Sequence, residues 1–406
     1  MIATADEFRT GIRGLDGTWP ALPALWSYSS LRDAEECPRR WALSRATYPA
    51  IWDRPGYPPR PILPALLGDI VHRSLDLILR RLYEAGCASI ADASAVDVLR
   101  ALGGYSGLAE RLIGEQMDSL QSNPRMADQV AGLRSALKAR IPAIRQRVQA
   151  LVARATLVPR EPAGEAAADA VPASDRASLS AGSHPEVTLH APELRMAGRA
   201  DLITVGAGSC SIVDYKTGAP DGHHADQLRL YALIWARDIE LNPEAMPATS
   251  LTLSYATHDE RVEPLEPHAL ELLAQQLTDR IASTESELML RPPPARPSPT
   301  TCRLCSVRQL CDDYWSSAAI DPASMPRGFG DCEGTIISQN GPRSWVIEVD
   351  SDRRSLLRTP TEDPGFRVGD RVRLLGAALA RDDDSGDETI TLTRTSEVFQ
   401  LADRVY

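Results

Sequence analysis

The sequence predicts an α/β protein whose first half is mostly helical and whose C-terminal end is a separate β-rich unit. Apolar side chains recur at i, i+3 and i+4 through much of residues 29–157, the spacing of amphipathic helices. Short apolar runs of the β type follow between residues 186 and 257. Beyond Pro326 the chain consists of short β-type runs separated by turns. A length of 406 residues predicts about two to three domains, and 43% apolar residues suffice to build their cores.

The composition argues against a membrane protein and against an exported one. No apolar stretch approaches the ~18 residues that span a bilayer, and residues 1–10 lack the basic-then-apolar pattern of a leader. We therefore expect a cytoplasmic protein with no membrane partner. The net charge of −11 argues against a surface covered by nucleic acid, so any such site is expected to be a local groove.

Helical patterns fill the first half in order. The first begins with Ser29 or Ser30 as its N-cap and continues to Trp41. The second covers residues 64–85 and ends before Gly86. Further helices are predicted over residues 91–102, 107–120 and 127–157.

Strand patterns dominate the middle of the chain after a low-complexity stretch. Residues 159–185 are almost entirely Pro, Ala, Gly, Ser, Asp and Glu, which bury too little apolar surface to offset ordering entropy, so we predict a flexible insertion. Helices are predicted over residues 225–237 and 267–290. The prolines of residues 291–300 then require an extended chain. Strands are expected over residues 186–189, 194–205, 210–215 and 249–257.

The C-terminal residues 327–406 predict a small β-barrel that is OB-like. The pattern Val368-Gly369-Asp370-x-Val372-x-Leu374-x-Gly376 suits such a barrel, and Asn340-Gly341 is a favoured hairpin turn. The barrel can hold a single strand, dock a protein or be purely structural, and its few aromatic residues leave these alternatives open. The expected strands cover residues 332–338, 345–350, 355–359, 371–379 and 389–399.

The strands at 194–205 and 210–215 predict a hairpin that gathers three charged residues. In its symmetric register Asp201 faces Asp214, and Lys216 lies on the same face as Asp214 because alternate residues share a face. Like charges across a ladder are destabilising unless a positive group lies between them. Lys216 is also one of only two lysines in the chain. The pattern favours a metal site, with a solvated surface hairpin as the alternative.

Clustered cysteines predict a second metal centre. The chain has seven cysteines, an odd number, so a disulfide framework is not expected. Cys302, Cys305 and Cys311 supply three closely spaced thiolates, and Cys37 is the best candidate for a fourth. Zinc, an iron–sulfur cluster and unligated core cysteines are the alternatives.

Four motifs in sequence order resemble those of the RecB-like PD-(D/E)XK nuclease superfamily. The resemblance covers about residues 27–314 and implies a restriction-endonuclease-like core with helical additions. It divides the chain into an N-terminal extension (1–26), a nuclease domain (27–318) and the barrel (327–406). The motifs are Gly68-x-x-x-His72, Gly198-Arg199-Ala200-Asp201, Asp214-Tyr215-Lys216-Thr217-Gly218 and Gln227-x-x-x-Tyr231.

The resemblance assigns a metal-ligand set around the hairpin. It implies that Asp201, Asp214 and the backbone carbonyl of Tyr215 hold Mg²⁺ or Mn²⁺, which prefer oxygen ligands. His72 would be a further ligand and would shift the preference toward Mn²⁺. Glu186 is a weaker candidate, because a carboxylate commonly precedes the Gly-x-x-Asp motif in this family.

The resemblance also assigns the residues that act beside the metal and the activity. Lys216 would orient the attacking water, and Gln227 and Tyr231, one helical turn apart, would steer Lys216 or a phosphate oxygen. Cys37, within Cys37-Pro38-Arg39-Arg40, and the three late cysteines resemble the AddB-type, CRISPR-associated exonuclease-like branch, whose four cysteines hold a [4Fe–4S] cluster; zinc remains the alternative.

The expected function is a metal-dependent DNA nuclease, an exonuclease or end-processing enzyme of repair, recombination or defence. Its DNA would be single-stranded or a duplex end. A helicase or other partner would be another chain, because this sequence has no Gly-x-x-x-x-Gly-Lys-Ser/Thr motif. The alternative is a non-catalytic iron–sulfur DNA-binding subunit of a helicase–nuclease or defence complex.

Overall fold

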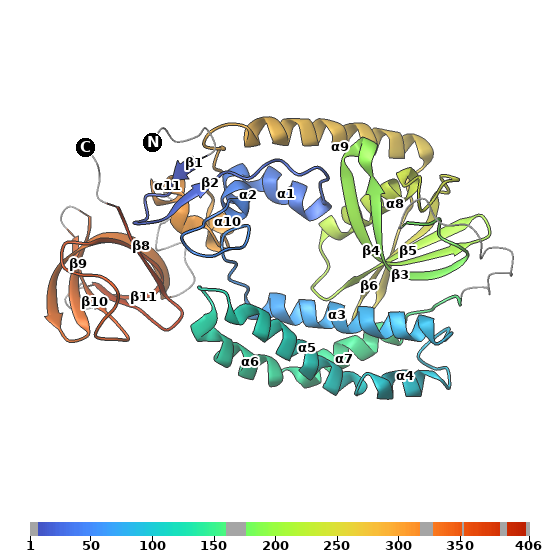
Figure 1. Cartoon of the computed structure of the whole chain (residues 1–406), viewed down its shortest axis with the longest axis horizontal. Coiled ribbons are helices and arrows are strands. Elements are labelled where there is room, and N and C mark those ends of the chain that lie inside the picture. The colour runs from blue at the N-terminus through green and yellow to red at the C-terminus, as the bar shows by residue number, and fades with distance from the viewer. Residues whose placement is uncertain (1–6, 160–175, 317–327, 351–352, 382–387, 403–406) are drawn as a thin grey trace.

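Figure 1 shows a β-barrel at one end of the long axis and a sheet toward the other end, with a layer of helices that runs along one side of the sheet. No helix in the part of the chain described is long and apolar enough to cross a membrane. Most of the predicted flexible insertion, residues 160–175, lies outside the described residues. The computed structural model describes residues 7–159, 176–316, 328–350, 353–381 and 388–402.

The sheet has the strand order β3-β4-β5-β6-β7. Strands β3, β4 and β5 are antiparallel neighbours, whereas β5 and β6 run parallel because helix α8 (Gly222–Arg237) crosses between them. The predicted strands are confirmed, although β3 begins inside the stretch predicted to be an insertion and β7 was not predicted. The bounds are β3 (Gly182–Ala191), β4 (Met196–Gly206), β5 (Ser209–Lys216), β6 (Ala248–Tyr255) and β7 (Asp259–Val262).

Helices cover both faces of this sheet, which therefore contributes to two apolar cores. Leu202 and Tyr215 pack into the core of the helical layer, while Ile203 and Ile212 join the core on the opposite face. The helical layer comprises α3 (Leu63–Glu84), α4 (Ala95–Ala101), α5 (Gly104–Gln121), α6 (Val130–Lys138) and α7 (Ile141–Val152). The opposite core is formed with α8, α1 (Tyr28–Glu36), α2 (Pro38–Arg45) and α9 (Pro267–Leu288).

The first predicted helix is wrong in two details. Its N-cap is Ser27, whose hydroxyl accepts a hydrogen bond from the Ser30 N–H at 3.2 Å, and neither Ser29 nor Ser30 is the cap. The helix also ends at Glu36, because Cys37 adopts an extended backbone and Pro38 begins the next helix.

The long helix predicted over residues 127–157 is divided as well. A 3₁₀ turn (Ala127–Gln129) is followed by α6 and α7, with the break just before Pro142 in the first turn of α7. A proline ring clashes inside a helix but fits its first turn, so the chain restarts the helix there.

The C-terminal strands close into a five-stranded barrel, consistent with an OB-like domain. Neighbours follow the order β12-β10-β9-β8-β11, and β12 also pairs with β11 to close the ring, while β13 adds to the edge of β11. The predicted Asn340-Gly341 turn is wrong, because Gly341 pairs with Ser344 inside the hairpin ladder. The strands are β8 (Phe329–Gly341), β9 (Ser344–Asp350), β10 (Arg353–Arg358), β11 (Arg371–Arg381), β12 (Glu388–Thr391) and β13 (Glu397–Gln400).

The N-terminal extension forms a small hairpin that was not predicted. Its strands are β1 (Glu7–Arg9) and β2 (Asp16–Thr18), which pair antiparallel. Isolated bridges join Ile12 to Leu401 and Thr18 to Thr47. The hairpin therefore connects the last part of the barrel to the segment that follows α2.

Candidate active site and cysteine cluster

The β4–β5 hairpin has the predicted register. Ile203 pairs with Ile212, and the ladder continues to Leu202 opposite Val213. The next position brings Asp201 beside Asp214, at the end where backbone pairing stops. There the Asp201 carboxylate accepts a hydrogen bond from the Tyr215 N–H at 2.6 Å. The Asp201 carboxylate thus accepts a hydrogen bond that a carbonyl of the neighbouring strand would otherwise accept. This bond fixes the side chain at the open end, or mouth, of the hairpin.

The two carboxylates repel each other. Burial, followed by the charge of Asp214, raises the pKa of Asp201 well above its ordinary value. Asp214 itself is 4% exposed. Two neighbouring buried carboxylates cannot both ionise cheaply without a cation between them, so the site favours a bound positive charge.

A chain of polar contacts leads from Asp214 into helix α8. The Lys216 ammonium forms an ion pair with Asp214 and donates to Gln227 Oε1 at 2.7 Å. Gln227 Nε2 in turn donates to the Tyr231 hydroxyl at 2.7 Å. Because Gln227 and Tyr231 lie four positions apart on the helix, both side chains face the hairpin.

Two motif glycines allow the surrounding elements to approach closely. A Cβ atom at Gly198 would lie 2.7 Å from Cε1 of Tyr231, so only glycine leaves room for that ring. A Cβ atom at Gly68 would lie 3.3 Å from the Thr217 hydroxyl, so α3 passes close to the residue that follows β5. Both contacts bring helices against the carboxylate pair.

Helix α3 delivers His72 to the same site. Burial lowers the pKa of His72, with Asp214 raising it and Lys216 lowering it in smaller measure. These influences show that the ring lies among the charges of the hairpin. The lowered pKa favours the neutral imidazole near neutral pH, and a neutral ring nitrogen can bind a metal ion.

Glu186 lies opposite Asp201 on the neighbouring strand. The β3–β4 register pairs Pro185 with Leu202 and Val187 with Ala200, which leaves Glu186 across from Asp201. Its backbone is left-handed with φ of +56°, and its carboxylate pairs with Arg199. Burial raises the pKa of Glu186, and the charge of Asp76 raises it further.

Asp76 is an acidic residue near the site that was not predicted from the sequence. It lies on α3 one turn after His72, accepts from Arg80 Nη2 at 2.8 Å and is 4.0 Å from Arg199 Nη2. The signal that could have found it is its i+4 spacing from His72 on a helix facing the sheet.

The residues present fit a hard divalent cation. Asp214 Oδ2 is buried and accepts no hydrogen bond within the described residues, although it pairs with the Lys216 ammonium. The described residues contain no group of three or more His, Cys, Asp or Glu side chains placed to hold a metal ion. A cation bound here would compete with the ammonium for this oxygen, and the carboxylate pair would supply the oxygen ligands that Mg²⁺ and Mn²⁺ prefer.

The four predicted cysteines line one cavity of about 20 Å³. Cys37 comes from the joint between α1 and α2, and Cys302 from α10 (Pro299–Arg303). Cys305 and Cys311 follow in the chain before α11 (Asp312–Ser316), and α10 begins within the stretch predicted to be extended. Tertiary folding thus gathers cysteines from opposite ends of the nuclease region.

The cysteines share a cavity, but among the described residues no group of three or more His, Cys, Asp or Glu side chains is placed to hold a metal ion. The Arg40 N–H donates to Cys37 Sγ at 3.5 Å and the Ser298 N–H donates to Cys302 Sγ at 3.4 Å. Burial raises the pKa of Cys305 to about 12, so metal binding would have to release its proton. A cavity of this size holds about one water-sized group.

The cysteine segment is attached to the barrel through Asp331 of β8. Arg308 Nε donates to Asp331 Oδ2 at 2.5 Å, and the Tyr314 hydroxyl donates to the same oxygen at 2.9 Å. The Gly376 N–H donates to Asp331 Oδ1 at 2.8 Å. Asp331 is 4% exposed, so the barrel supplies a buried counter-charge to Arg308 of the cysteine segment.

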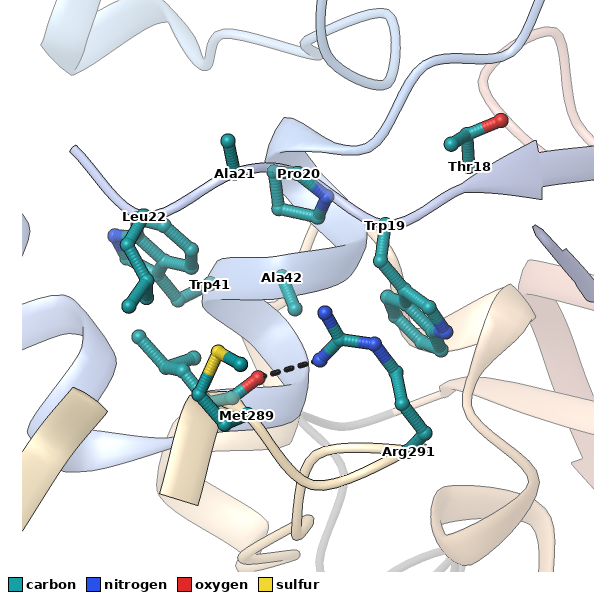
Figure 2. Close-up of a pocket in the computed structure, with 10 residues that line it drawn as sticks. Thr18, Trp19, Pro20, Ala21, Leu22, Trp41, Ala42, Met289 and Arg291 are labelled. Atoms are coloured by element: carbon teal, nitrogen blue, oxygen red, sulfur yellow. Dashed lines mark hydrogen bonds between the residues drawn. The ribbon is translucent and has the colours of Figure 1, made fainter. Parts of the chain in front are cut away.

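A second cavity, of about 180 Å³, lies between the β2–α1 connection, α2 and the end of α9 (Figure 2). Trp19 and Trp41 contribute to its wall. Arg291 Nη1 donates to the Leu288 carbonyl at 2.7 Å, so this guanidinium helps to end α9. The cavity is separate from the carboxylate pair and from the cysteines.

Comparison with known proteins identifies a family for most of the chain. The model of the PD-(D/E)XK nuclease superfamily matches residues 25–312. The search of curated proteins gave no significant match.

Solved structures show only weak overall similarity. The tetrameric p202 HIN2 is 16% identical with a TM-score of 0.16, and the match covers 18% of this chain and 42% of that one. The OB domain of MM0293 from Methanosarcina mazei is 10% identical with a TM-score of 0.16, covering 20% and 78%. The RecJ complex with Mn²⁺ from Thermus thermophilus is 13% identical with a TM-score of 0.14, covering 83% and 48%. TM-scores this low establish neither a shared fold nor a shared function.

Proposed function

Because the chain belongs to the PD-(D/E)XK nuclease superfamily, we propose that it is a metal-dependent DNA nuclease that hydrolyses phosphodiester bonds. The observation that carries this proposal is the polar chain at the mouth of the β4–β5 hairpin. There two neighbouring carboxylates meet a lysine whose ammonium is oriented by an amide from α8. The alternative, a non-catalytic DNA-binding subunit, does not require this lysine to be held in place.

The ligands of the proposed metal are the groups that converge on this mouth. Asp201, Asp214 and the Tyr215 carbonyl would hold Mg²⁺ or Mn²⁺, with His72 as a nitrogen ligand and Glu186 as a weaker candidate. The bound ion supplies Lewis-acid polarisation of the scissile phosphate. Carboxylates that repel each other without a cation become favourable ligands once the cation is present.

Lys216 would act on the water and the phosphate rather than on the metal. Gln227 Oε1 accepts from its ammonium, and Tyr231 accepts from Gln227 Nε2. Because an ammonium only donates, it requires the amide oxygen to face the lysine, and the tyrosine hydroxyl accepts from the other end of the amide. With Asp214 as a metal ligand, the ammonium would keep the Gln227 contact and would have N–H donors left for a water or a phosphate oxygen.

We also propose that the four cysteines hold a metal centre that joins the two ends of the nuclease domain. A [4Fe–4S] cluster is the first candidate and zinc the second. Broad absorbance near 400 nm with bound iron would support the cluster, and a colourless protein with stoichiometric zinc would overturn it. We propose in addition that the nuclease acts on DNA ends in repair, recombination or defence. A helicase or other partner would be supplied by another chain.

The direct test is cleavage of end-labelled single-stranded and duplex DNA with Mn²⁺ or Mg²⁺. We expect the parent protein to cleave and Lys216→Arg to lose about 10²-fold in rate, because a planar guanidinium does not reproduce a compact ammonium. Metal binding and melting temperature of Lys216→Arg should stay close to those of the parent. DNA binding without any metal-dependent cleavage by the parent would establish the non-catalytic alternative.

A further inference from the structure

His224 and Tyr255 lie on the two elements that flank Lys216. His224 is in the first turn of α8, one helical turn before Gln227, so both side chains lie on neighbouring parts of one face. Tyr255 ends β6 and is the register partner of Lys216 across the parallel β5–β6 pair. Neither residue belongs to the motifs that the sequence pointed to.

The two side chains are joined by a hydrogen bond between His224 Nδ1 and the Tyr255 hydroxyl, 2.9 Å apart. Burial raises the pKa of Tyr255, which keeps the phenol protonated. A phenol that donates its proton to Nδ1 leaves the proton of the neutral imidazole on Nε2.

Tyr255 is held firmly enough to orient the histidine. Its ring stacks on His258, with centroids 5.1 Å apart and an angle of 17° between the planes. Its backbone N–H donates to the His258 carbonyl at 2.9 Å. The residue is 3% exposed, whereas His224 remains half-buried at the surface beside the site.

The open nitrogen of His224 lies within the field of the catalytic charges. Burial lowers the pKa of His224, and Lys216 lowers it further, while Asp221 and Asp214 raise it. The bond to Tyr255 uses Nδ1, and no group among the described residues forms a hydrogen bond with His224 Nε2. The ring is therefore a neutral donor next to an ammonium, an arrangement that suits an anionic oxygen ligand.

We propose that His224, oriented by Tyr255, donates its Nε2 hydrogen to a non-bridging oxygen of a phosphate in the bound DNA strand. This inference rests on the proposed nuclease function and assigns a strand-positioning contact on the α8 side of Lys216. His224 would bind the phosphate and would not ligate the metal. Tyr255 would be a positioning residue that acts through His224.

The test measures binding of a single-stranded oligonucleotide in Ca²⁺, together with cleavage in Mn²⁺. We expect His224→Ala to weaken binding about 10-fold, the size expected for one hydrogen bond to a charged group, and Tyr255→Phe to weaken it less. His223→Ala is the matched control, because His223 is an exposed neighbour in the same helical turn. Its affinity should equal that of the parent.

Methylphosphonate substitution identifies the contacted phosphate. Replacing a charged oxygen by a methyl group at one position should weaken binding by the parent but produce no further loss with His224→Ala. Equal binding by His224→Ala and His223→Ala would overturn the inference, as would an unchanged methylphosphonate profile. A parent that does not cleave DNA contradicts the proposed function instead, because the Ca²⁺ binding measurement needs no cleavage. Unchanged melting temperatures confirm that the variants are folded.

Discussion

The carboxylate hairpin and the cysteine cluster are assembled in opposite ways. Asp201, Asp214 and Lys216 lie on neighbouring strands joined by a tight turn, and Gln227 lies on the helix that follows. The cysteines come from both ends of the nuclease region, and Asp331 of the barrel binds Arg308 in the segment that carries the late cysteines. The first site therefore depends on local register, whereas the second depends on the tertiary structure that surrounds it. Changes at the first should alter chemistry, and changes at the second should alter stability.

The largest effect is expected at the cysteine cluster. Cys37→Ala should lose the bound metal and lower the free energy of unfolding by several kcal/mol, because binding energy in such sites is folding energy. Metal content and the denaturant midpoint of the purified protein measure both effects. Cys87→Ala is the control, since Cys87 is buried in the other core. Full metal content in Cys37→Ala would show that this cysteine is not a ligand.

The largest effect on rate is expected at the hairpin. Asp214→Asn should reduce cleavage at least ~10³-fold, since it removes a charged ligand where electrostatic stabilisation is concentrated. The melting temperature without metal should change little, because loss of the repulsion with Asp201 opposes loss of the ion pair with Lys216. Single-turnover cleavage and thermal unfolding of the same preparation separate the two. A large loss of stability with intact chemistry would contradict the contrast between the two sites.

The contact between Asp331 of the barrel and Arg308 of the cysteine segment should contribute less to the free energy of unfolding than the metal does. Asp331→Asn leaves the Arg308 guanidinium without its buried counter-charge and should cost about 3 kcal/mol. Glu388→Gln is the control, because its ion pair with Arg353 is solvent-exposed and should be worth less than about 1 kcal/mol. Denaturant titration measures both variants. Equal stabilities of the two variants would mean that the barrel is not energetically coupled to the cysteine segment.

The smallest expected effect is a pH dependence of stability in the absence of metal. The pKa of Asp201 is raised in the folded protein, so the folded state binds this proton more tightly than the unfolded state. Stability should therefore fall as pH rises from the unfolded pKa near 4 through the folded value, by about 1.4 kcal/mol for each unit of pKa difference. The measurement is the melting temperature of parent and Asp201→Asn in a chelator. The two curves should diverge with rising pH and converge when metal is added.

The sequence determined the parts of the molecule that short-range geometry controls. Alternation along two strands and a tight turn were enough to bring Asp201, Asp214 and Lys216 together, and the i, i+4 spacing of Gln227 and Tyr231 put both on one helical face. Cysteine spacing likewise predicted a set of metal ligands, and the four side chains line one cavity. These relations hold because neighbours in a strand or helix are fixed by covalent geometry.

Only the tertiary structure decided the contacts between distant segments. Three contacts join elements whose relative placement no local pattern specifies: Asp331 with Arg308, Asp76 with Arg199, and the hydrogen bond between Tyr255 and His224. The break at Cys37 has a local cause instead, because Pro38 restarts the helix although the apolar periodicity continues across it. Packing of side chains around two cores selects one arrangement among many that the same helices and strands allow.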